Sequence, residues 1–172
     1  FVKQLILVAA LLVLPLCSFL ISEQVLKARG PYWVGSNFDP DYVYLLNSLN
    51  IVNHRSPEHV DHPGTPVQAL GAAVIATLTT EDTAEGMTSQ VLKDPEYYLG
   101  WISRALRGLN VLACWLAGVS VLYVTRRVEL GLLGQAILGF SPQVIDQLVR
   151  VSPEPLLFSI STVLGSLVIL TV

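Results

Sequence analysis

The sequence predicts an all-α polytopic membrane protein, with about four transmembrane helices and a large first extracytoplasmic loop that carries interfacial helices. Hydrophobic residues make up 52% of the 172 residues and charged residues only 13%, whereas a soluble domain carries about 25% charged residues. The mean hydropathy is +0.59. The net charge is −3 and no basic patch interrupts the sequence, so we expect no nucleic-acid partner.

The first expected span covers residues 5–22, which are apolar over about the twenty residues that a membrane helix needs. A signal peptide is the alternative for such a run. Residues 22–27 lack a small-x-small cleavage site, and Pro15 is tolerated inside a membrane helix. We therefore expect a retained first span.

Three further spans are expected at residues 108–125, 130–149 and 156–172. The third contains glycines, which let membrane helices approach each other closely. Pro153 and Pro155 come at the start of the fourth, where a helix loses no hydrogen bond to proline. The chain ends inside this apolar run, so we expect it to be the N-terminal part of a longer protein.

The apolar run 67–80 is short for a span and typical of a re-entrant or interfacial helix. If this run does not cross the membrane, Lys3 and the two arginines at 126–127 lie on the same side of the membrane, as the positive-inside rule requires. Residues 23–99 carry ten acidic residues against four basic ones. We expect the loop 23–103 to lie on the outer face of a bacterial inner membrane or its equivalent.

Asp39 and Pro40 predict a helix start within this loop, because Asp caps helices and Pro favours the first helical position. The residues that follow predict an interfacial amphipathic helix. Its apolar face comprises Tyr42, Leu45, Leu46, Leu49 and Val52, and its polar face Asn47, Asn50 and Asn53. Residues 79–96 are predicted to form a solvated loop.

The stretch 37–66 gathers most of the chemistry-bearing side chains of the loop. Asp39 and Asp41 follow the first span, where a carboxylate could act as general base on an acceptor hydroxyl. The alternative is structural, since both carboxylates also suit a helix N-terminus.

The same stretch contains residue types that bind metals, but their spacing does not predict a metal site. The residues are His54, Glu58, His59, Asp61 and His62. Their order matches no zinc pattern. Pro57 also breaks any helix that could present two histidines on one face.

Arginines stand where the chain enters the membrane from the outer side. Arg104 and Arg107 precede the second span and are either interface anchors or a phosphate clamp, since arginine binds phosphate oxygens bidentately. Arg150 and Asp146, at the outer end of the third span, pose the same alternatives.

The order of these parts resembles the N-terminal portion of the C-type (GT-C) membrane glycosyltransferases, the group with the protein O-mannosyltransferases and aminoarabinose transferases. The acidic pair of that family corresponds to Asp39-Pro40-Asp41, which a tyrosine-rich helix start follows. Its His-Pro-Pro-Leu motif corresponds to 62–66, HPGTP. Arg107 opens the second span, and 152–157, SPEPLL, resembles the entry into the fourth. The family pair is usually contiguous, and Gly64-Thr65 replaces Pro-Leu.

The resemblance implies that a sugar moves from a polyprenyl-phosphate donor to an acceptor hydroxyl on a glycan, lipid or protein, with inversion. Asp39 or Asp41 would be the base, and the resemblance leaves open which. His62, Arg107 and Arg150 would bind the donor phosphate. Some relatives use a divalent metal and others do not, so no cofactor is certain and a divalent metal stays open.

Two other classes of function compete with this reading. A transporter subunit should carry ionisable groups in the middle of its spans, and residues 5–22 and 108–125 contain none. A non-catalytic membrane assembly protein would instead display the outer loop to a partner. Scattering of Asp39, Asp41, His62 and Arg107, rather than convergence, would favour that class.

Overall fold

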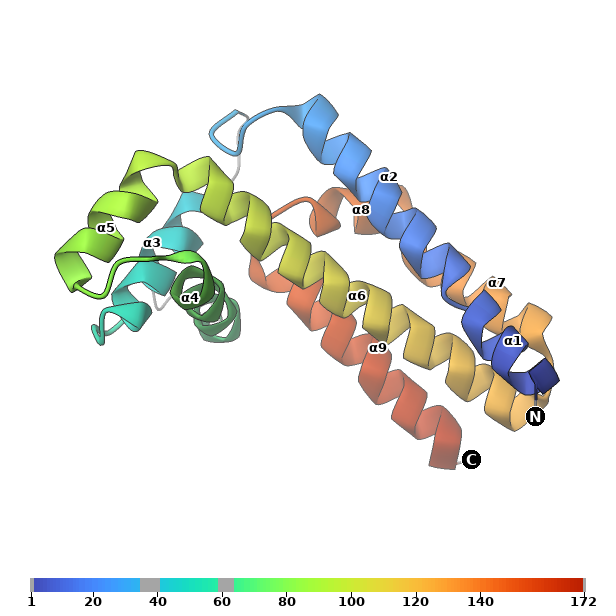
Figure 1. Cartoon of the computed structure of the whole chain (residues 1–172). Coiled ribbons are helices and arrows are strands. Elements are labelled where there is room, and N and C mark those ends of the chain that lie inside the picture. The colour runs from blue at the N-terminus through green and yellow to red at the C-terminus, as the bar shows by residue number, and fades with distance from the viewer. Residues whose placement is uncertain (1, 35–40, 59–63, 172) are drawn as a thin grey trace. The chain divides into compact units, whose positions relative to one another are not determined.

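The computed structural model describes residues 2–34, 41–58 and 64–171, and all regular structure in these ranges is helical (Figure 1). The helices are α1 Val2–Ala10, α2 Val13–Arg29, α3 Asp41–Val52, α4 Thr65–Leu78, α5 Ala84–Lys93, α6 Pro95–Thr125, α7 Val128–Gly139, α8 Pro142–Leu148 and α9 Pro153–Thr171.

The predicted all-α class with about four apolar helices is confirmed in this coarse form. Within the described ranges, three helical segments are long and apolar enough to cross a membrane: Val2–Arg29, Pro95–Thr125 and Pro153–Thr171. The pair α7 and α8 makes a fourth if it counts as one bent span. The second segment begins at Pro95, well before the expected start near residue 108. The orientation of the loop and the membrane type stay predictions.

The third expected span, 130–149, is not one straight helix. Helices α7 and α8 meet at an angle of 65°. Pro142 opens α8, and proline both lacks an N–H donor and disfavours helical geometry in the residue before it. The helix therefore stops at Gly139 and restarts in a new direction.

The prediction of a solvated loop over residues 79–96 was wrong, because this region contains α5. The Thr83 side chain caps the helix by accepting a hydrogen bond from the Gly86 N–H at 3.1 Å. Glu85 lies in the first turn and Lys93 in the last, so both charges complement the helix dipole. These signals were present in the sequence.

The chain divides into two compact units. Unit 1 comprises Arg107–Val149 together with the apolar helices at the two ends of the chain, and unit 2 comprises Arg29–Leu106 and Arg150–Pro153. In unit 1, α9 runs alongside the later part of α6 (Figure 1).

In unit 1, a buried glutamine supplies a hydrogen bond that proline removes from the first helical segment. Pro15 has no N–H, so the Leu11 carbonyl lacks its usual donor four residues later. Gln135 Nε2, on α7, donates to the Leu11 carbonyl at 2.9 Å and to the Cys114 carbonyl at 3.1 Å. Gln135 is only 2% exposed. One side chain therefore ties together the α1–α2 break, α6 and α7.

Glycines make room for this glutamine. A Cβ at Gly118 would lie 2.3 Å from Gln135 Nε2, and a Cβ at Gly131 would lie 2.9 Å from the Gly118 carbonyl oxygen. Two further bonds join the first segment to the other helices. Trp115 Nε1 donates to the Val8 carbonyl at 3.0 Å, and Ser18 Oγ donates to the Gly139 carbonyl at 2.8 Å.

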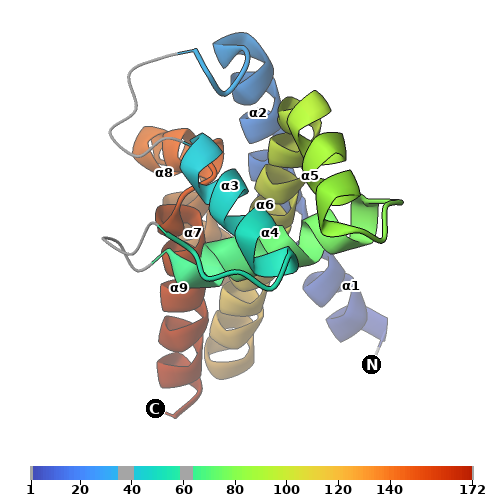
Figure 2. The same cartoon turned by 90° about the vertical axis from the view of Figure 1, so that its left-hand side faces the viewer.

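In unit 2, α3 packs against α4 (Figure 2). The buried residues of α3 recur at helical spacing and are Asp41, Tyr44, Leu45, Asn47, Ser48 and Leu49. Gly71 of α4 permits the close approach, since a Cβ there would lie 2.2 Å from Ser48 Oγ.

The predicted division of α3 into an apolar and an asparagine face was correct for Leu45 and Leu49, which are buried, and wrong for Asn47 and Leu46. Asn47 is buried, and its Oδ1 accepts a hydrogen bond from the Glu58 N–H at 2.7 Å. Leu46 is 44% exposed. Packing against α4 and against the segment after α3 decides which side is buried. The placement of α3 on the membrane surface stays a prediction.

Replacing Gly118 with alanine should destabilise unit 1, because the new methyl group would displace Gln135 from the Leu11 carbonyl. We expect Gly118→Ala to lower the free energy of unfolding by about 1–3 kcal/mol, as overpacked cores do. Thermal or denaturant unfolding of the full chain in detergent measures the change.

Gly134→Ala is the matched control, because no atom lies within 4 Å of a Cβ at this helical glycine. It should raise the free energy of unfolding by about 0.5–1 kcal/mol, the helix preference of alanine over glycine. Equal effects of the two substitutions would contradict the role of Gly118.

Candidate functional site

Asp41 lies at the start of α3 and is 1% exposed. Its Oδ1 accepts a hydrogen bond from the Val151 N–H, and its Oδ2 lies 3.6 Å from Arg29 Nη2. All three residues belong to unit 2. The carboxylate therefore holds together the end of the first helical segment, the start of α3 and the turn before α9.

Burial raises the pKa of Asp41 above the ordinary value of 3.8. The Val151 N–H and the positive charges of Arg29 and Arg150 act in the opposite direction, since they favour the ionised form. Burial is the larger effect. A carboxylate with a raised pKa is a stronger base than an ordinary aspartate.

The two carboxylate oxygens of Asp41 differ in their surroundings. Oδ1 accepts the hydrogen bond from the Val151 N–H, whereas Oδ2 accepts no hydrogen bond from the residues that the structure describes. The contact of Oδ2 with Arg29 is an ion pair at 3.6 Å, which is longer than a hydrogen bond. Oδ2 is therefore the atom that could accept a proton from a substrate hydroxyl.

Glu96 fixes the neighbourhood of Asp41. The Tyr32 N–H donates to both Glu96 oxygens at 3.1 and 3.0 Å, and the Tyr42 hydroxyl donates to Glu96 Oε1 at 2.6 Å. Burial, together with this bond to Glu96, raises the pKa of Tyr42 to about 12. The phenol therefore stays protonated and keeps α3 attached to the start of α6.

Arg107 is in a different setting, within unit 1. Its Nη2 lies 2.9 Å from Glu23 Oε1, its guanidinium stands 5.2 Å from the centre of the Phe19 ring, and it is 1% exposed. The Glu23 partner neutralises the charge in apolar surroundings. A phosphate-binding role for Arg107 stays a prediction.

Among the predicted site residues, the structure brings Asp41 and Arg150 together in unit 2. Asp39 and His62 lie outside the described residues. The described ranges contain no cluster of three or more His, Cys, Asp or Glu side chains placed to bind a metal.

Sequence reasoning missed two residues of this site, Arg29 and Glu96. Arg29 stands out as a basic residue in an acidic region directly after the first span, which is the available signal. Glu96 follows Pro95 and looks like an ordinary first-turn acid. Its contacts with Tyr32 and Tyr42 join residues far apart in the sequence.

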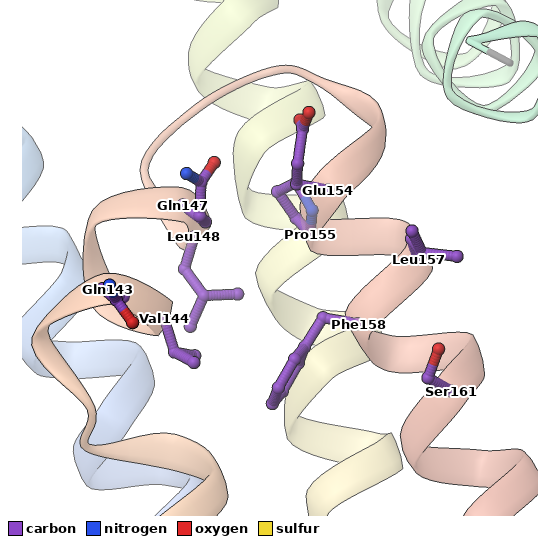
Figure 3. A pocket seen from close by; sticks show the side chains of 9 residues that line it. All are labelled: Gln143, Val144, Gln147, Leu148, Glu154, Pro155, Leu157, Phe158 and Ser161. Atoms are coloured by element: carbon purple, nitrogen blue, oxygen red, sulfur yellow. The ribbon is translucent and has the colours of Figure 1, made fainter.

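A groove of about 340 Å³ in unit 1 lies between α8 and α9 (Figure 3). Val144, Leu148 and Phe158 point toward its interior, and Gln147 and Glu154 lie at one end. The predicted site residues that the structure describes, Asp41, Arg107 and Arg150, do not line it.

Comparisons of the chain with protein-family models, with curated proteins and with solved structures found no match. The candidate site therefore rests on the motif order in the sequence and on the buried carboxylate with its arginine neighbours.

Removing Arg29 should destabilise unit 2 at neutral pH, because Asp41 would keep its negative charge without its ion-pair partner. We expect Arg29→Gln to lower the free energy of unfolding by about 1–3 kcal/mol near pH 7. Denaturant titrations of the full chain at several pH values measure this difference.

The pH dependence follows from the direction of the shift. Folding raises the Asp41 pKa, so its contribution to stability is present at low pH and is lost as the pH rises through the folded-state pKa. Removal of the Arg29 charge raises the folded-state pKa of Asp41 further, so the free energy of unfolding at neutral pH falls by a larger amount. The deficit should shrink as the pH approaches about 4.

The control is Arg127→Gln, which removes the exposed pair between Arg127 and Glu129. We expect little change there, because solvent screens exposed ion pairs. A deficit for Arg29→Gln that did not depend on pH would contradict the role of Asp41 ionisation.

Proposed function

We propose that the chain is part of a membrane glycosyltransferase that moves a sugar from a polyprenyl-phosphate donor to an acceptor hydroxyl on the extracytoplasmic side. Two observations support this proposal. The motif order resembles the C-type glycosyltransferases, and Asp41, one of the two candidate bases, is a buried carboxylate of raised pKa with arginines beside it.

In the proposed reaction, Asp41 Oδ2 accepts the proton of the acceptor hydroxyl. The acceptor oxygen forms a bond to the anomeric carbon while the bond from that carbon to the phosphate oxygen breaks. The electron pair leaves with the polyprenyl phosphate, and the configuration at the anomeric carbon inverts. Asp39 stays the alternative base.

The leaving phosphate gains negative charge in this step, and fixed cations in a water-poor site stabilise such charge. Arg150 acts on Asp41 electrostatically, so it lies where a cation would be useful. We assign it to the donor phosphate. His62 and Arg107 keep the phosphate-binding role that the resemblance implies.

The observation that carries the proposal is that Asp41 Oδ2 accepts no hydrogen bond from the residues that the structure describes. Because only 1% of Asp41 is exposed, an acceptor reaches Oδ2 only if a covering segment moves.

The same contacts favour a second candidate, a non-catalytic membrane assembly protein. An aspartate that bonds to Val151 and pairs with Arg29 also has a structural use, since it joins distant segments of unit 2. The two candidates differ in what loss of the Asp41 charge should do: it removes transfer in the first, and it affects only folding in the second.

Asp41→Asn should abolish transfer while the protein still accumulates, because asparagine can keep the bond from Val151 but is not a base. We expect a loss of about 100-fold or more if Asp41 is the base. Transfer of radiolabelled sugar from lipid-linked donors in membranes measures activity, and immunoblotting of those membranes measures accumulation.

Asp39→Asn and the double variant complete the series, and Asp82→Asn, at an exposed position, is the control that should keep full activity. Full activity in both single variants and in the double variant would overturn the proposal. Loss of accumulation in Asp41→Asn, with transfer per molecule unchanged, would support the assembly protein.

The rate of transfer should rise with pH, and this rising limb of the pH–rate profile should follow the ionisation of Asp41. A general base works only when ionised, and burial moves the Asp41 pKa upward. We therefore expect kcat/KM to rise through an apparent pKa above the ordinary aspartate value. Arg29→Gln should move this limb to higher pH, because it removes a charge that favours ionisation. A profile that is flat from about pH 4 upward would contradict the assignment.

A further inference from the structure

An open groove of about 440 Å³ lies in unit 2 between α4 and the first turns of α6. Ala73, Val74 and Leu78 form part of the α4 wall, and Trp101, Arg104 and Ala105 form the α6 wall. The walls are mainly apolar. Among the described residues that line the groove, Arg104 is the charged one.

Arg104 and Trp101 are arranged as a pair at this groove. The Arg104 guanidinium carbon stands 5.2 Å from the centre of the Trp101 ring. A Cβ at Gly100 would lie 4.0 Å from Arg104 Nη1, so the arginine lies back along the helix over the preceding turn. Both side chains are exposed, Trp101 by 41%. Stacking on the indole holds the cation at the edge of an apolar surface.

The position in α6 indicates the depth of this groove in a membrane. Helix α6 is long and apolar enough to span and begins at Pro95. Tyr97, in its first turn, is 46% exposed and stands edge to face with Trp101 at 6.5 Å. Aromatic side chains near the end of a span mark the level of the lipid headgroups. Arg104 is therefore placed near lipid phosphates.

Arg104 and Arg107 differ although they are one turn apart. Arg107 is buried and contacts Glu23 and Phe19. Arg104 is exposed, and its guanidinium stands over Trp101 beside an apolar groove. The sequence offered both residues the same two roles, interface anchor or phosphate clamp. The exposed cation with an apolar groove beside it suits a ligand that has a phosphate and a hydrocarbon chain.

We propose that this groove binds an anionic glycerophospholipid of the bilayer. The lipid phosphate contacts the Arg104 guanidinium, which offers two parallel N–H donors, and one acyl chain lies along Ala73, Val74 and Ala105. Charge complementarity selects the occupant, since Arg104 supplies positive charge and no acidic side chain lines the groove within the described residues. The proposal does not depend on the glycosyltransferase activity.

Trp101 provides a direct readout, because bromine on an acyl chain quenches a nearby indole. The full chain would be reconstituted in phosphatidylcholine bilayers that contain a small fraction of brominated phosphatidylglycerol or of brominated phosphatidylcholine. The fluorescence of Trp101→Phe comes from Trp33 and Trp115 alone. Subtracting it from the fluorescence of the unmodified chain gives the Trp101 signal. We expect brominated phosphatidylglycerol to quench this signal at about fivefold lower mole fraction than brominated phosphatidylcholine.

Two variants separate the charge from the groove. Arg104→Gln should abolish the preference for phosphatidylglycerol, and Ala73→Phe, which fills the groove without changing charge, should weaken quenching by both lipids. The matched control is Arg126→Gln, which removes a guanidinium stacked on Tyr123 at 5.1 Å near the other end of α6. It should leave quenching of Trp101 unchanged.

Equal quenching by the two brominated lipids in the unmodified chain would overturn the proposal. An unchanged preference in Arg104→Gln would do so as well. If Arg126→Gln removed the preference as fully as Arg104→Gln, the preference would reflect overall charge rather than this groove, and the proposal would fail.

Discussion

The hydrogen bond from Gln135 to the Leu11 carbonyl is the contact on which the packing of unit 1 depends. Pro15 leaves that carbonyl without its helical donor, and lipid offers no water to replace the missing partner. A donor must therefore come from another helix. Gly118 gives Gln135 the space to reach it. The broken first segment, α6 and α7 are thus held in register by one polar side chain in apolar surroundings.

The same constraint shapes unit 2 around Asp41. A buried carboxylate is costly unless hydrogen bonds and opposite charges compensate it, and Val151, Arg29 and Arg150 do so. These partners determine both the packing of the segments and the basicity of the carboxylate. A structural role and a catalytic role for Asp41 therefore rest on the same contacts, and only the behaviour of the ionised group separates them.

Local patterns accounted for most of the helical class, but not for every element. The helix α5 was missed although Thr83 and Lys93 gave capping and dipole signals, because its polarity resembles that of a loop. The bend between α7 and α8 follows from Pro142, yet the run around it is apolar enough to resemble one straight span. Burial of Asn47 could not be predicted, since it depends on the Glu58 N–H that the fold brings to it.

Composition and the length of apolar runs act locally, so they were enough to predict the all-helical class and the location of the apolar segments. The sequence also marked Asp41, Arg107 and Arg150 as candidates, through their place beside those segments. The pairing of Arg107 with Glu23, and of Asp41 with Arg29 and the Val151 N–H, became visible only in the folded chain. These partners are separated along the sequence, and they meet because helices pack together and buried charges need compensation.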